Sequence, residues 1–236
     1  MLREFVFQFI LWFANTVQTI TGFAGNLLAM PFSIRVVGMQ DAKTVINLFS
    51  MFGCLVVAVQ GRRLIRWRIL GKILLCMIVG MSVGVCLAEL VPEGQLLLIY
   101  AVLVILIAVR KLCWKRDFDL PEWFMVCVLF VAGIIHGMFL SGGALLVVYA
   151  LSVLPHKDEF RATVATVWIV LDGILAVVYG FQGHYTVLNI ERIGVSMLAL
   201  VLSALAGNYL YHRMNQEMFQ ILTYVLILIS GLSLLL

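Results

Sequence analysis

The sequence predicts an all-α integral membrane protein with about eight hydrophobic segments. Hydrophobic residues make up 64% of its 236 positions and charged residues only 12%, whereas an average soluble domain is about 45–50% apolar and about 25% charged. Too few charges remain to cover a water-exposed surface, so we expect the outer surface to face a lipid bilayer. Two further observations refine this prediction: the lengths of the charge-free stretches and an internal repeat.

Charge-free stretches mark the individual segments. With histidine counted as neutral, they cover residues 5–34, 44–61, 73–88, 94–109, 123–156, 162–190 (interrupted by Asp172), 193–212 and 218–236. Most approach the roughly 17–25 residues that a spanning helix needs. The stretches 5–34 and 123–156 are too long for one straight crossing and too short for two full ones.

Both long stretches carry a cluster of glycine and polar residues near their middle, TGFAGN at 21–26 and HGMFLSGG at 136–143. Glycine inside a helix costs about 1 kcal/mol relative to alanine. Non-helical backbone at membrane depth is tolerated only where it is buried in protein or lines a cavity. We therefore predict that each stretch consists of two half-helices that meet at a break. The alternative is one long, tilted helix whose small residues allow close packing.

The two halves of the chain match each other. Residues 25–28 (GNLL) align with residues 143–146 (GALL) at a shift of 118 positions, and the same shift pairs Lys43 with Arg161. Duplicated halves with interrupted helices in corresponding positions are typical of transporters that bind their substrate at the repeat interface.

This duplication predicts two homologous four-segment repeats, residues 1–116 and 117–236, within one transmembrane domain. If each long stretch is a re-entrant hairpin, the repeats are inverted, and if each crosses once, they are parallel. Short basic loops stay on the cytoplasmic side, which places residues 62–72 and 110–116 there. Inversion would add three further basic residues to that side: Lys157, Arg161 and Arg213. The charge bias therefore favours inverted repeats.

The glycine-rich segments also resemble a known family. GFAGNLLAMP at residues 22–31, repeated in weaker form at 139–148, resembles the paired glycine-rich motifs of the TauE/SafE sulfite exporter family. The resemblance covers the whole chain, including its length, its repeat and its basic loop. It departs from the family pattern at Asn26, where a third small residue is common. The resemblance implies a multi-pass secondary transporter of the cell (inner) membrane that exports sulfite, a sulfonate or a related organic anion.

An anion site also follows from the predicted breaks. Helix N-termini carry partial positive charge and unpaired N–H groups, so a break in each long stretch offers two anion sites. The expected substrate-binding residues are Thr21, Gly22, Gly25, Asn26, Lys43, Ser141, Gly142, Gly143 and Arg161. The competing interpretation is that the glycines only let helices approach closely, and that the two basic residues are interfacial anchors.

Two titratable residues are candidates for proton coupling. Asp172 is the only formally charged residue well inside a predicted span, and an intramembrane carboxylate is a functional-site hypothesis by default. It carries a proton, stays protonated, or pairs with Trp168 or another helix. His136 precedes the second break, and it either takes part in proton coupling or ties two helices together.

Other functions find less support in the sequence. An intramembrane enzyme needs paired His, Glu, Asp or Ser residues at helical spacing, and neither HExxH nor GxSxG occurs. We therefore expect no enzyme. The five cysteines form no CxxC pair, so we expect no metal and no cofactor. No folded basic domain that would bind nucleic acid is evident. An anion channel, a non-transporting membrane subunit and a homo-oligomer remain open.

Overall fold

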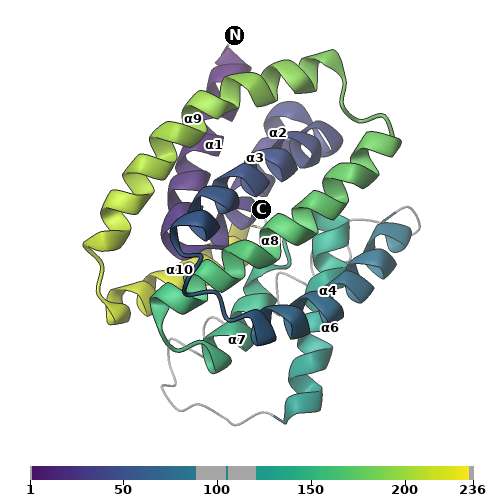
Figure 1. Cartoon of the computed structure of the whole chain (residues 1–236). Helices are drawn as coiled ribbons and strands as arrows, with labels where there is room; N and C mark the ends of the chain where they lie inside the picture. The colour runs from purple at the N-terminus through teal and green to yellow at the C-terminus, as the bar shows by residue number, and fades with distance from the viewer. Residues whose placement is uncertain (1, 89–104, 106–120, 234–236) are drawn as a thin grey trace.

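The chain folds as a bundle of helices. The computed structural model describes residues 2–88, 105 and 121–233, and within these residues it holds nine α-helices and no strand, which confirms the predicted all-α class. In the labels of Figure 1 the helices are α1 (Leu2–Thr21), α2 (Ala24–Val37), α3 (Met39–Gln60), α4 (Trp67–Leu87), α6 (Glu122–Phe139), α7 (Gly143–Val153), α8 (Lys157–Phe181), α9 (Val187–His212) and α10 (Gln216–Ser233).

Among the described helices, five are long and apolar enough to cross a membrane, namely α3, α4, α6, α8 and α9. This finding supports the predicted multi-pass arrangement. Helices α2 and α7 are apolar but shorter, with 14 and 11 residues. The predicted segment at 94–109 lies outside the described residues, so the count of eight segments stays a prediction.

Both long stretches are interrupted at their glycine clusters. α1 ends at Thr21 and α2 begins at Ala24, with Gly22 at a φ of 83° between them. α6 ends at Phe139 and α7 begins at Gly143. The two helices of each interrupted stretch differ in length, however. α1 has 20 residues and α2 has 14, and α6 has 18 and α7 has 11. At about 1.5 Å per residue, the first helix of each stretch (α1 or α6) is long enough to reach across most of a bilayer. Only the second helix (α2 or α7) is a half-helix, which corrects the prediction of two half-helices in each stretch.

Ion pairs fix which helix ends lie together. Near the start of α9, Arg192 contacts Glu4 at the start of α1 (2.7 Å) and Asp41 at the start of α3 (2.9 Å). We call this side the Arg192 end. At the other end of α3, which we call the Arg66 end, Arg66 forms an ion pair with Glu159 at the start of α8. Because α1 and α3 both begin at the Arg192 end, α1 and α2 form a hairpin that enters and returns there.

The second hairpin enters from the opposite side. Lys72 in the first turns of α4 forms an ion pair with Glu122 at the start of α6, which puts that start at the Arg66 end. Helix α8 also begins at the Arg66 end, directly after α7. The hairpin of α6 and α7 therefore enters and returns at the Arg66 end.

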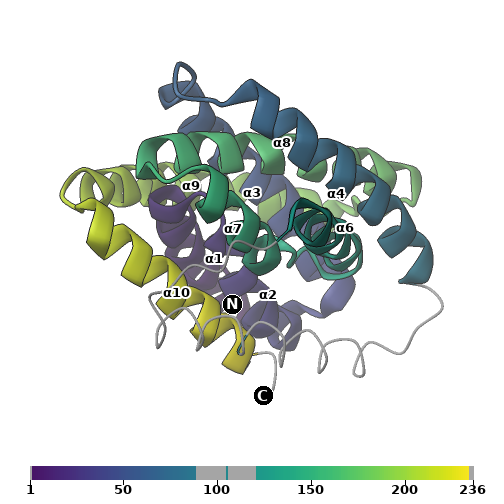
Figure 2. The same ribbon diagram turned by 90° about the horizontal axis from the view of Figure 1, so that it is seen from below.

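Helices from the two halves of the chain pack side by side. α1 contacts α9, and α3 contacts α8, so the green α8 and α9 lie along the purple and blue α1 to α3 in Figure 1. Figure 2 shows the yellow α10 on another side of the same group, where it contacts α2. The α1–α2 hairpin thereby packs against helices of the C-terminal half of the chain.

Helices α4 and α6 approach each other through glycines. A Cβ atom on Gly84 would lie 2.2 Å from the carbonyl oxygen of Ile134. A Cβ atom on Gly133 would lie 2.3 Å from the carbonyl oxygen of Met77. Gly80 and Gly137 make equivalent approaches. Small residues at such positions let two membrane helices pack backbone against backbone, and this contact holds the α6–α7 hairpin against the bundle.

We expect Gly84→Val to destabilise the protein, because the new side chain would force α4 away from the Ile134 carbonyl group. Overpacking of this kind typically costs about 1–3 kcal/mol, which corresponds to a fall in Tm of about 3–10 °C. Thermal unfolding of the purified protein in detergent measures this change. Gly71→Val is the matched control, since nothing lies within 4 Å of a Cβ atom there, and equal Tm values for both variants would contradict the packing argument.

Candidate functional site

The two helix breaks meet at an internal cleft. It is lined by Gln18, Phe23, Asn26, Leu27, Ser50, Leu140, Gly143 and Trp168. These residues come from the α1–α2 hairpin, the α6–α7 hairpin and the long helices α3 and α8. The cleft encloses about 200 Å³ of empty space and is too narrow to admit a water-sized sphere. We call it the break cleft.

The breaks touch each other directly. A Cβ atom on Gly143, the first residue of α7, would lie 3.3 Å from Cδ1 of Leu27 and 3.4 Å from the carbonyl oxygen of Phe23. On the same side, Leu140 turns the chain out of α6 with a φ of 52°. Non-glycine residues seldom adopt this left-handed conformation, and such strain clusters at functional sites. The second break is therefore held in a costly shape where it meets the first.

The break cleft offers hydrogen-bond donors, and none of its lining residues carries a carboxylate. The indole Nε1 of Trp168 is buried and has no hydrogen-bond partner among the described residues. Asn26 adds a side-chain amide in the first turn of α2. Helices α2 and α7 both begin here, and the first N–H groups of a helix lack partners within that helix and form the positive end of its dipole. This combination suits a small anion.

Gln18 forms one wall of the break cleft. Its side-chain nitrogen donates a hydrogen bond to the Ser50 hydroxyl oxygen (2.8 Å) and lies 2.8 Å from the Cys54 sulfur. A Cβ atom on Gly25 would lie 1.8 Å from the Gln18 side-chain oxygen. Gly25 is therefore required for α2 to lie against Gln18, which joins the packing role of this glycine to the shape of the cleft.

Asp172 and His136 lie together beside the break cleft. Nε2 of His136 is 3.2 Å from Oδ1 of Asp172, and both side chains are fully buried. The His136 ring also packs against Trp168, with 5.0 Å between ring centroids, so the pair contacts the wall of the cleft. The carboxylate of Asp172 thus meets His136 on α6, and its role in proton coupling stays a prediction.

Two predicted site residues shape the first break without lining the cleft. The Thr21 hydroxyl donates to the Val17 carbonyl oxygen (2.9 Å) and accepts from the Ala24 amide (3.3 Å), so it ends α1 and caps α2. Gly22 packs against α8, since a Cβ atom there would lie 3.0 Å from the Arg161 carbonyl oxygen. Both residues therefore act on the backbone of the break in this conformation.

The second break contains two further predicted residues. A Cβ atom on Gly142 would lie 2.2 Å from the carbonyl oxygen of Ala132, so this glycine lets the break fold back onto α6. Ser141 is buried beside it. Of the predicted glycines in this break, only Gly143 lines the cleft.

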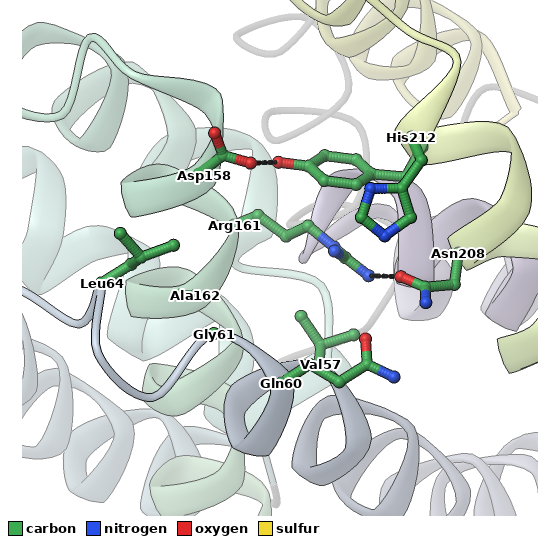
Figure 3. Close-up of a pocket in the computed structure, with 10 residues that line it drawn as sticks. Val57, Gln60, Gly61, Leu64, Asp158, Arg161, Ala162, Asn208 and His212 are labelled. Carbon is green, nitrogen blue, oxygen red and sulfur yellow. Dashed lines mark hydrogen bonds between the residues drawn. The ribbon is translucent and has the colours of Figure 1, made fainter.

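A larger cavity lies at the Arg66 end, and we call it the Arg161 cavity. It encloses about 750 Å³ of empty space, including the part open to the surface. Its lining residues are Val57, Gln60, Gly61, Leu64, Asp158, Arg161, Ala162, Asn208, Tyr211 and His212. Figure 3 shows the Arg161 side chain extending across this space toward Asn208.

Several neutral groups hold the Arg161 side chain in place. Its Nε donates to the Thr19 carbonyl oxygen at 2.6 Å, and Nη2 donates to the Asn208 side-chain oxygen at 3.2 Å. The guanidinium carbon lies 4.0 Å from the centre of the Tyr211 ring. Arg161 therefore joins the Arg161 cavity to the end of α1, one turn from the first break.

Lys43, the predicted counterpart of Arg161, lies elsewhere. It is buried near the start of α3, at the Arg192 end, and it lines neither the break cleft nor the Arg161 cavity. The two basic residues that match in sequence therefore lie toward opposite ends of the bundle.

Six of the eight cleft residues were not predicted as site residues: Gln18, Phe23, Leu27, Ser50, Leu140 and Trp168. Gln18 carries a usable signal, because lipid cannot satisfy a polar side chain in an apolar stretch. Trp168 and Ser50 carry none, since their positions depend on how α8 and α3 pack around the breaks. The strained backbone of Leu140 is visible only in the structure.

Comparisons with known proteins identify a family and a relative of the chain. The model of the family described as "Sulfite exporter TauE/SafE" matches residues 8–234. Among curated proteins, the "Probable inner membrane transporter protein TsaS" of Comamonas testosteroni is 27% identical over 175 residues, which cover 73% of each chain. No solved structure matches the chain.

We expect Gly25→Ala to lower stability by about 1–3 kcal/mol, because the new methyl group would overlap Gln18 and push α2 away from α1. Thermal unfolding in detergent measures the loss. Gly173→Ala in α8 serves as the control, since its Cβ atom would meet only the Met51 sulfur at 3.8 Å. Equal stability of the two variants would show that α2 does not depend on this close approach.

Proposed function

Because the chain belongs to the sulfite exporter TauE/SafE family, we propose that it is a secondary transporter that exports a small anion across the inner membrane. Sulfite, a sulfonate or a related organic anion is the proposed substrate class. One observation carries this proposal: two interrupted helices meet at a cleft that offers donors and no carboxylate among its lining residues. Membership in a transporter family also supports a role other than that of an enzyme.

The proposed substrate site is the break cleft. Trp168 and Asn26 would donate hydrogen bonds to the oxygens of the anion, together with the first amides of α2 and α7. Gly25 and Gly143 would keep side chains out of the way at the two helix starts. A helix N-terminus binds oxyanions through its amides and its dipole, so two of them aimed at one cleft give a site that needs no formal positive charge.

We further propose that residues 1–116 and 117–236 are inverted repeats. The α1–α2 hairpin enters from the Arg192 end and the α6–α7 hairpin enters from the Arg66 end. The proposed repeats thus present their hairpins from opposite sides of the membrane. This arrangement matches transporters whose binding site lies at the interface of inverted repeats.

The Arg66 end is proposed to be cytoplasmic, because the basic loop 62–72 lies there. The Arg161 cavity is at this end, whereas at the Arg192 end Arg192 ties α9 to Glu4 and Asp41. This asymmetry supports an inward-facing state of a carrier. The narrowness of the break cleft favours a carrier over a channel, since an open channel needs a continuous path.

The pair formed by Asp172 and His136 is the proposed coupling site. Its contact with Trp168 brings its charge close to the break cleft. Taking up a proton removes one negative charge from this low-dielectric region, where charges interact strongly. Proton uptake by the pair would therefore favour binding of the anion.

We expect Asn26→Ala and Arg161→Ala each to lower the initial rate of transport by about tenfold or more, as loss of a hydrogen bond to a charged group typically costs about 1.5–3 kcal/mol. Lys43→Ala should also lower the rate, because it removes a buried positive charge near the start of α3. Uptake of radiolabelled sulfite or methanesulfonate by liposomes that contain the purified protein measures the rate. The exposed Arg62→Ala controls for general loss of positive charge. Absence of flux under every ion gradient, together with normal behaviour of the three variants, would refute the proposed function.

We expect transport to accelerate as the pH falls on the loading side, because protonation of the coupling pair favours the anion. Asp172→Asn should flatten this dependence, since it fixes a neutral side chain beside His136. Initial rates between pH 5.5 and pH 8 measure the effect, in a range where histidine titrates. Glu217→Gln, an exposed carboxylate at the start of α10, should keep the wild-type profile. An unchanged profile in Asp172→Asn would exclude this carboxylate from coupling.

A further inference from the structure

The Arg161 cavity differs from the break cleft in the room it offers. About 380 Å³ of it admits water-sized spheres, whereas no part of the break cleft does. Its wall includes apolar side chains such as Val57 and Leu64 beside polar ones such as Gln60 and Asn208. The cavity is therefore large enough for an anion that still holds part of its water, or for an organic anion with a small apolar body.

Arg161 supplies a positive charge that forms no ion pair within the described part of the chain. Its hydrogen bonds go to the backbone of Thr19 and to the neutral Asn208, and its flat face covers the ring of Tyr211. No carboxylate among the described residues lies within ion-pair distance of it, although the side chain of Arg161 is only 7% exposed. A charge buried in this way is costly unless it is paired, and an incoming anion would pair with it.

The one carboxylate among the lining residues of the cavity is already engaged. Asp158 accepts a hydrogen bond from the hydroxyl of Tyr211, as Figure 3 shows. Lys157 lies over the same aromatic ring, 4.4 Å from its centre, and donates to the backbone of Met214. Around the ring of Tyr211 there are thus two cations and one anion, which leaves a net positive charge at the cavity.

The cavity is distinct from the break cleft but lies in line with it. Along α8, Arg161 lines the cavity and Trp168 lines the cleft, while Val57 and Ser50 do the same along α3. Seven residues separate the members of each pair, a distance of about 10 Å along a helix. The end of α1 lies between, where Thr19 contacts Arg161 and Gln18 reaches the cleft.

We propose that the Arg161 cavity is a separate anion-binding station, which holds a hydrated oxyanion or small sulfonate before it enters the break cleft. This inference rests on the proposed function for the direction of movement, but the binding itself does not require transport. Arg161 attracts and holds the anion, Asn208 and Gln60 supply hydrogen bonds, and Val57 and Leu64 contact an apolar substituent. The anion then loses its water on passing the end of α1.

Charge-selective labelling of a cysteine in the cavity tests this proposal. In the full-length chain with its five cysteines replaced by serine or alanine, Gln60→Cys places a thiol on the cavity wall. Asn215→Cys, in the loop between α9 and α10, is the exposed control at the same end. Each purified variant reacts in detergent with an anionic methanethiosulfonate, the ethylsulfonate, and with its cationic trimethylammonium counterpart.

We expect the ratio of the anionic to the cationic labelling rate to be roughly tenfold higher at Gln60→Cys than at Asn215→Cys, because a positively charged cavity concentrates anions. Arg161→Gln should remove this preference while leaving the ratio at Asn215→Cys unchanged. Methanesulfonate, which does not react with thiols, should slow labelling at Gln60→Cys. It should do so equally in Trp168→Phe, which removes the indole donor from the break cleft but keeps the cavity.

Three results would overturn the proposal: no anionic preference beyond that of the control, a preference that survives Arg161→Gln, or loss of the methanesulfonate effect in Trp168→Phe. The last result would mean that methanesulfonate binds in the break cleft and slows labelling in the cavity only indirectly. Failure of the proposed function gives a different pattern, in which liposomes show no flux although labelling keeps its charge preference and its dependence on Arg161.

Discussion

Backbone hydrogen bonding in the absence of water is the constraint on which this structure depends. Inside a bilayer each unpaired N–H or C=O group costs several kcal/mol, so helices normally continue without interruption. Here they are interrupted twice. Thr21 satisfies part of the first break by capping α2. At the second break, the Leu140 amide donates to the carbonyl oxygen of His136. One donor that remains without a partner among the described residues, the indole of Trp168, lies at the cleft where the breaks meet. A ligand with several acceptor oxygens would accept hydrogen bonds at the cleft and so offset the free-energy cost of an unpaired donor there.

The glycines show that close packing and site formation are not alternatives. Gly25 is needed because Gln18 leaves no room for a side chain, and Gly142 because the break folds onto Ala132. These are packing roles. Yet the close approach of α2 to α1 is what puts Gln18 and Asn26 on the same cleft, and the tight turn at Gly142 is what brings α7 to Phe23. The interpretation that assigned the glycines only to packing and the one that assigned them to a site describe the same contacts.

Sequence alone predicted the elements whose cause is local. The helical class, the multi-pass composition and the two interruptions follow from apolar length and glycine content. Asn26 and Gly143, which were expected at the first and second break, both line the break cleft, and their role in binding stays a prediction. The unequal lengths of the helices on the two sides of each break were not predicted, because a glycine cluster shows that a helix ends without showing how deep in the membrane the end lies. The contact between His136 and Asp172 was missed because it joins α6 to α8 across 36 positions of sequence. Trp168 was weighed only as a neighbour of Asp172, since an aromatic residue in an apolar helix gives no sign that its N–H lacks a partner.

The placement of charge follows from what a carrier must do with an anion. A guanidinium group inside the break cleft would form a bidentate, charge-assisted pair with a sulfonate or sulfite, which is roughly twice as strong as bonds to neutral donors. Such a pair in a dry site would bind the anion and release it slowly. The structure instead lines the cleft with neutral donors and keeps Arg161 about 10 Å away along α8, in a cavity that water enters. The residue that attracts the anion is thereby kept apart from the cleft that would enclose it. Asp172 and His136 form a titratable pair whose contact with Trp168 brings it close to the cleft. In the proposed carrier, the neutral lining allows release, and the protonation state of that pair decides when binding is favoured.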